Sequence, residues 1–246
     1  MRRPSWQVVL GISLIALSVI FYLIQYAIFR DARHLFMFLL GDIAFVFLEV
    51  LLVTLIIHRL LSEREKRARL EKLNMVIGAF FSEAGTVLLT YLSDFDPKLE
   101  QIKGELLVRE SWSEREFAQV SKRLKAYDYS VDLSRVNLAD IKNFLVGKRD
   151  FFLRLVENPS LLEHETFTAL LRGVFHLTEE LASREKVVDL PATDYAHLAG
   201  DVKRVYGQLV TEWLDYMKYL KGNYPFLFSF AMRTNPFDST ASAIVR

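Results

Sequence analysis

Two carboxylates inside an otherwise apolar stretch, Asp42 and Glu49, are the residues best placed to do chemistry. They lie seven residues apart, so on a helix both point from one face, roughly 10 Å from each other. Neither this run nor the apolar run before it contains Lys or Arg. Because a charged carboxylate in lipid is costly, the pair must meet water, another polar group or a cation, or stay protonated.

The preceding apolar run carries polar residues that could face these carboxylates. Ser18 and Gln25 recur at the same seven-residue spacing. In an antiparallel pair of helices Tyr22 falls near the depth of Asp42, and a serine of this run falls near that of Glu49. One interpretation is that these groups only bond the helices, or copies of the chain, to one another. The alternative is that all five side chains line a path for a cation or a proton.

A second group combines histidine with acids at helical spacing. His164 lies in a Glu-His-Glu triplet, and His176 precedes Glu180 by one helical turn. A histidine with an acid one turn away can bind a metal ion, which makes His164, His176 and Glu180 candidate ligands. His197 precedes Asp201 at the same spacing. The order differs from the Glu-x-x-His of di-iron bundles, and such pairs are more often solvated.

The composition excludes several classes of function. The chain has no cysteine, which removes disulfide frameworks, thiol catalysis and Cys-ligated zinc. Its formal net charge of +1 over 246 residues is not that of a nucleic-acid-binding protein. No Gly-rich phosphate loop, G-x-S-x-G elbow or kinase motif occurs. We therefore predict a protein that is not an enzyme and that needs no cofactor.

The N-terminal quarter predicts a transmembrane hairpin. Residues 6–29 contain no charge and would form a helix of about 36 Å, enough to cross a hydrocarbon core of about 30 Å. Residues 35–57 form a second apolar run, and the link of residues 30–34 is short enough to force an antiparallel arrangement. Backbone groups in lipid must be satisfied internally, so both runs should be helical. We assign residues 1–61 to this hairpin.

The distribution of basic residues predicts the orientation of the hairpin. Arg2 and Arg3 precede the first run, and six Lys or Arg residues lie between positions 59 and 72, whereas the link has only two. The positive-inside rule therefore places both ends of the chain in the cytoplasm, with the hairpin in the cytoplasmic (inner) membrane.

Residues 73–92 leave an alternative topology open. They contain a single charge, Glu83, and could form a third span that places the remaining chain outside. Asn74, Ser82 and Thr86 dilute the run, so we favour a buried helix of the domain that follows.

The sequence predicts an all-α protein. Residues 62–246 are expected to form a cytosolic helical bundle, with residues 62–92 as a connecting helix. Glycine and proline are sparse, and apolar residues recur at helical spacing. One helix is expected over residues 138–157, and a long helix is expected to end near Gly222 with Trp213 facing inward. The expected helix starts are Ser113, which opens the capping box S-E-R-E, then Asn137, Ser160 or Glu163, and Thr193.

Four segments resemble a broad prokaryotic family of two-span membrane proteins that has no assigned activity. They are LGDIAFVFLEVLLVTLIIH at residues 40–58, the stretch of residues 148–184, the stretch of residues 194–229, and RTNPF at residues 233–237. The resemblance covers most of the chain after residue 41. It implies an architecture of two spans and a helical domain, and it implies no chemistry.

These observations predict a membrane-anchored, non-enzymatic helical protein that binds the lipid bilayer, itself and a protein partner on its cytosolic domain. The alternative is one subunit of an oligomeric cation channel or transporter, with Asp42 and Glu49 along the path. Two spans cannot enclose a pore, so this alternative requires an oligomer.

Overall fold

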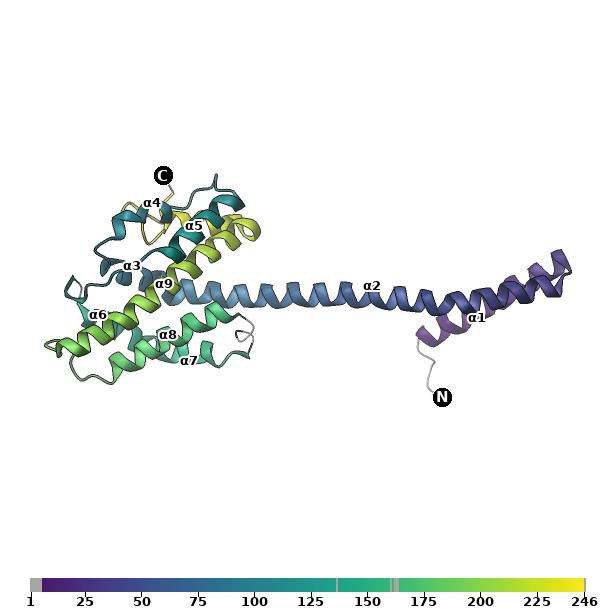
Figure 1. The fold of residues 1–246 in the computed structure, drawn as a ribbon, viewed down its shortest axis with the longest axis horizontal. Helices are drawn as coiled ribbons and strands as arrows, with labels where there is room; N and C mark the ends of the chain where they lie inside the picture. Colours follow the sequence, from purple (N-terminus) through teal and green to yellow (C-terminus); the bar gives the residue numbers. More distant parts are fainter. Residues whose placement is uncertain (1–5, 136, 160, 162–163, 246) are drawn as a thin grey trace. The chain divides into compact units, whose positions relative to one another are not determined.

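The computed structural model describes residues 6–135, 137–159, 161 and 164–245. These residues form helices and connecting turns, with no strand among them, so the all-α prediction is confirmed for this part of the chain (Figure 1). The chain divides into two compact units, one up to Lys66 and one from Arg67 onward. Arg2 and Arg3, on which part of the topology prediction depends, lie outside the described residues, as do Ser160 and Glu163.

The first unit consists of α1 (Trp6–Phe29) and the first part of α2 (Ala32–Phe80). The connection between them is shorter than the predicted link, because α2 already begins at Ala32. Arg30 adopts a left-handed conformation with φ of 52°, and the Asp31 carboxylate accepts a hydrogen bond of 3.0 Å from the Arg33 amide. Both helices are long and apolar enough to cross a membrane, a test that a soluble core helix or a signal sequence also passes.

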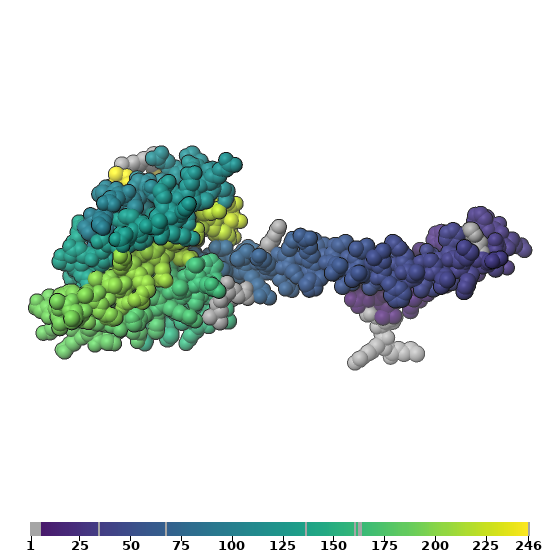
Figure 2. Space-filling model, viewed as in Figure 1, coloured from purple at the N-terminus to yellow at the C-terminus, as the bar shows by residue number. Residues whose placement is uncertain are grey.

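The second unit is a helical bundle that contains the end of α2. Its remaining elements are η1 (Phe81–Gly85), α3 (Thr86–Asp94), η2 (Leu99–Gln101), α4 (Lys103–Leu106), α5 (Glu114–Ala126), η3 (Leu133–Arg135), α6 (Leu138–Gly147), α7 (Arg149–Val156), α8 (Glu165–Ala182), α9 (Ala192–Asn223) and α10 (Pro225–Arg233). The long helix α9 packs against α8, α5, α10 and α3. On the face shown in Figure 2, α5 in teal and α9 in green lie against each other.

Helix α9 supplies much of the core because its apolar residues repeat at helical spacing. Leu198, Val205, Leu209 and Trp213 are all buried, which confirms the inward position predicted for Trp213. The Trp213 ring packs edge-on against Phe237 near the C-terminus. Burial of such side chains contributes about 1.5–3 kcal/mol each, so α9 organises the bundle that positions the polar groups described below.

Residues 73–92 contribute one face to the core of the second unit. Ile77, Phe80, Leu88 and Leu92 are buried within that unit, as expected for a core helix and unlike a third span facing lipid. The helix widens to a π-turn over Phe81–Gly85 before it continues as α3.

The predicted helix starts agree with the structure where a side chain caps the helix. Ser113 and Glu116 form the predicted capping box, and Asn137 caps α6 through the amide of Ala139. Thr193 is not a cap, because α9 begins one residue earlier, and the amides of Asp194 and Tyr195 donate hydrogen bonds to the Pro191 carbonyl.

The single helix expected over residues 138–157 is two helices. The break falls at Lys148, whose φ and ψ of −102° and 5° are not helical. Gly147, a poor helix former, precedes it. The Lys148 ammonium forms an ion pair of 2.9 Å with Glu83, so the break lets this side chain reach a distant part of the fold.

Candidate functional site

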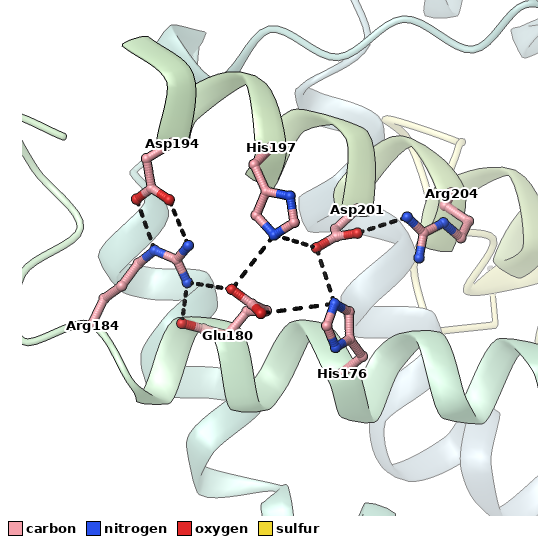
Figure 3. A network of polar contacts seen from close by, with 7 residues as sticks. All are labelled: His176, Glu180, Arg184, Asp194, His197, Asp201 and Arg204. Atoms are coloured by element: carbon pink, nitrogen blue, oxygen red, sulfur yellow. Dashed lines mark hydrogen bonds and ion pairs between the residues drawn. The ribbon is translucent and has the colours of Figure 1, made fainter. Parts of the chain in front are cut away.

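The antiparallel pair α8 and α9 brings together the most concentrated group of ionisable side chains (Figure 3). His176 and Glu180 lie one turn apart on α8, and His197 and Asp201 lie one turn apart on α9. Residues one turn apart share a helix face, so each helix presents a histidine and a carboxylate to the other. The helices run in opposite directions, which places His176 opposite Asp201 and Glu180 opposite His197.

The four side chains converge through their imidazole Nε2 and carboxylate oxygen atoms. Nε2 of His176 lies 3.3 Å from Asp201 Oδ2 and 3.9 Å from Glu180 Oε1. Nε2 of His197 lies 3.5 Å from the same Asp201 Oδ2 and 3.6 Å from Glu180 Oε2. The ligand atoms of His176, His197 and Asp201 all lie within 4.8 Å of one another. These are residue types and distances that could hold a metal ion or pass a proton.

Asp201 is the buried member of this group. Its side chain is 3% exposed, whereas those of His176 and His197 are 48% and 51% exposed. One carboxylate oxygen, Oδ1, accepts a hydrogen bond of 2.8 Å from Arg204. The other, Oδ2, is buried and receives no hydrogen bond, although both imidazoles point toward it. Buried polar atoms are normally satisfied, so this oxygen calls for an explanation.

Arg184 forms ion pairs with two carboxylates at the edge of this group. Its guanidinium bonds to Asp194 Oδ1 at 2.6 Å and to Glu180 Oε2 at 2.8 Å. Hydrogen bonds from Arg184 hold the pKa of both carboxyls below their usual values. Glu180 therefore stays ionised, with Oε2 taken by Arg184 and Oε1 turned toward His176.

The predicted ligand His164 lies elsewhere on α8. Its Nδ1 accepts a hydrogen bond from the Phe167 amide, so His164 caps the N-terminus of the helix. It lies twelve positions before His176, about 18 Å along a helix, and one ion cannot bind both. Of the three predicted ligands, His176 and Glu180 therefore lie in one group, whereas His164 does not belong to it.

Sequence reasoning missed the pairing of the two helices. A signal was present, because His176-x3-Glu180 and His197-x3-Asp201 repeat one pattern on neighbouring helices. Periodicity could not supply the register that places the two pairs face to face.

The predicted intramembrane residues lie on the first unit. The Tyr22 hydroxyl donates a hydrogen bond of 2.9 Å to Asp42 Oδ2, across α1 and α2. Gln25 is half-buried, whereas Ser18 and Glu49 are exposed. The structure therefore brings Tyr22 and Asp42 together, as expected for an antiparallel pair of helices.

Family models match most of the chain. The model described as "MJ1433, N-terminal helical domain" matches residues 2–61, and that described as "Uncharacterized protein MJ1433, C-terminal helical domain" matches residues 69–233. The chain belongs to the MJ1433 family. Uncharacterized protein MJ1433 of Methanocaldococcus jannaschii is 42% identical over 244 residues, which cover 99% of this chain and 98% of that protein. No solved structure matches.

The MJ1433 family models leave a gap at residues 62–68, where the structure also divides the chain after Lys66. The resemblance to a family without assigned activity is confirmed by these descriptions, which name helical domains and no reaction.

Proposed function

We propose that this chain is a membrane-anchored, non-enzymatic interaction protein. Residues 1–61 would form a hairpin across the cytoplasmic membrane with both ends inside, and the helical domain would bind protein partners, including a second copy of the chain.

The observation that carries this proposal is the exposure of apolar side chains around α1 and the first part of α2. In both candidate spans the most apolar window has no buried residue. Large apolar side chains are exposed on all sides, as at Ile15, Phe21, Phe47 and Ile56. Since each such side chain favours an apolar environment by about 1.5–3 kcal/mol, water is a poor solvent for this surface and a bilayer is a good one.

A cleft in the second unit supports the interaction role. It has a volume of about 540 Å³ and lies between the end of α2, α9 and α10. Leu227 and Phe230 line it and remain about half exposed. On the same helix α10, Phe228 is buried in the domain, whereas Phe226 is 91% exposed. Apolar residues grouped in a cleft are typical of a surface that a partner covers.

Alkaline extraction of membranes tests the anchor. Full-length chain expressed in cells should remain in the membrane pellet after a carbonate wash and enter solution only with detergent. A variant lacking residues 6–57 should leave the pellet. Release of the full-length chain by carbonate alone would contradict the proposal.

Self-association is tested by the mass of the detergent-solubilised chain. Light scattering should give an oligomer for the native chain and a smaller species for Leu227→Ser with Phe230→Ser. Val188→Ser is the control, because Val188 is equally apolar and 62% exposed but does not line the cleft. A monomeric native chain would contradict self-association and would also rule out the channel.

The cation path is the second candidate function. It is favoured by the exposure of both Asp42 and Glu49 in an apolar helix, where ionisable residues usually have a role. The hydrogen bond from Tyr22 to Asp42 favours the packing role instead. Flux of cations into liposomes that carry the reconstituted oligomer separates the two.

A further inference from the structure

The buried oxygen Oδ2 of Asp201, together with the two imidazoles that face it, points to a site that the anchor and interaction roles do not use. We propose that His176, His197 and Asp201 bind a divalent transition-metal ion such as Zn²⁺. The inference concerns the second unit alone and stands whether or not the hairpin crosses a membrane.

The distances match the spacing of ligands around one ion. Ligand atoms about 2.0–2.2 Å from a tetrahedral zinc ion lie about 3.3–3.6 Å apart. Asp201 Oδ2 lies 3.3 Å from Nε2 of His176 and 3.5 Å from Nε2 of His197. The three ligand atoms all lie within 4.8 Å of one another, so rotation of the half-exposed imidazoles would bring both nitrogens to one ion beside Asp201 Oδ2.

Burial and hydrogen bonding favour an ion over a simple ion-pair cluster. Asp201 Oδ2 is enclosed, yet it receives no hydrogen bond from either imidazole. A metal ion would satisfy this oxygen and both Nε2 atoms at once, because it accepts lone pairs from all three. The half-exposed histidines leave a way in from solvent.

The surrounding contacts are those that orient metal ligands. Arg204 bonds to Oδ1 of Asp201 and so turns Oδ2 toward the imidazoles. Arg184 holds one oxygen of Glu180 and leaves Oε1 3.9 Å from Nε2 of His176. Outer contacts of this kind fix ligand orientation in known metal sites. Glu180 is thus in reach of the fourth position, which water could also fill.

The types of ligand atom indicate which metal ions the site would bind. Two imidazole nitrogens with one carboxylate suit zinc, iron, cobalt and nickel, whereas calcium and magnesium prefer oxygen ligands. Because three protein ligands leave at least one position open, the ion would remain accessible to a small ligand from solvent.

The test is a calorimetric titration of the full-length chain, purified in detergent and freed of metal with a chelator. We expect one Zn²⁺ per chain. His176→Asn and His197→Asn should each weaken binding at least about tenfold, since even loss of an outer contact typically costs 10–100-fold. His164→Asn is the matched control, because it makes the same change on α8 and asparagine also caps helices. It should bind as the native chain does.

Two further measurements separate a lost site from a misfolded variant. Zn²⁺ should raise the melting temperature of the native chain and of His164→Asn, but not those of the two site variants, whose circular dichroism should be unchanged. Co²⁺ bound to the native chain should give visible absorption that His197→Asn abolishes. Absence of saturable binding, or equal loss in His164→Asn, would overturn the proposal.

Discussion

The Tyr22 hydroxyl on α1 donates a hydrogen bond of 2.9 Å to Oδ2 of Asp42 on α2. This is a contact between side chains from the two helices of the first unit, and it joins residues twenty positions apart. A carboxylate among apolar side chains needs such a partner, so the bond explains how Asp42 can lie within an apolar helix without a basic neighbour.

Loss of this bond should loosen the hairpin. Asp42→Leu and Tyr22→Phe should each lower the stability of the full-length chain in detergent by about 0.6–2 kcal/mol, the range for hydrogen bonds between membrane helices. Asp42→Asn should lose less, because its amide still accepts a bond from Tyr22. Thermal unfolding followed by circular dichroism gives the comparison.

The same carboxylates decide the channel alternative. Asp42→Asn combined with Glu49→Gln should leave the oligomer intact if these groups only bond helices together. If native oligomers carry cations into liposomes and this double variant does not, the packing interpretation is wrong.

Trp213 tests the core assignment. Its side chain, on α9, is almost fully buried and packs against Phe237, so Trp213→Ala should cost about 3–5 kcal/mol in the free energy of unfolding. Trp6→Ala serves as the control, because Trp6 is 72% exposed on α1. Denaturant unfolding that leaves Trp213→Ala equal to the native chain would contradict the position of α9 in the core.

Gly85 and Gly200 should respond in opposite directions to the same change. A Cβ on Gly85 would lie 2.7 Å from ring atoms of Phe80 and Phe81, both buried, so Gly85→Ala should destabilise the fold by about 1–3 kcal/mol. A Cβ on Gly200 meets nothing within 4 Å, and Gly200→Ala should stabilise α9 by up to about 1 kcal/mol. Equal effects on the melting temperature would refute the close packing at the π-turn.

Glu212 should make stability depend on pH. Burial raises the pKa of this carboxyl, while a hydrogen bond with Thr166 and the charges of His164 and Lys125 oppose the rise. A raised pKa means that the folded chain holds the proton more tightly than the unfolded chain does. The stability that protonated Glu212 contributes is therefore fully present at a pH below its pKa in the unfolded chain. This stability is lost as the pH rises through its pKa in the folded chain.

Glu212→Gln should therefore be more stable than the native chain at neutral pH. The difference should shrink as the pH falls through the raised folded pKa toward about 4.5, the ordinary pKa of the group, and should then level off. Glu157→Gln, an exposed change, provides the control. An advantage of Glu212→Gln that grows on acidification would contradict the direction of the shift.

Local signals predicted the elements better than their arrangement. The cap at Ser113 and the buried position of Trp213 were both predicted. Each depends only on residues within a turn or two along the chain. The break at Lys148 was not predicted, and the partner of that side chain, Glu83, lies sixty-five residues away in the sequence. The site formed by His176 and Asp201 depends on the register of two helices, which no spacing within either helix specifies.

The most direct test of the account is the location of the turn between α1 and α2. A reporter that is active only outside the cytoplasm, inserted between Arg30 and Asp31, should be active, and the same reporter fused after Arg246 should be inactive. This result is expected because the basic residues flank the hairpin on the side of residues 59–72. An inactive reporter at the turn would contradict the transmembrane hairpin, and an active reporter after Arg246 would contradict the cytoplasmic position of the domain.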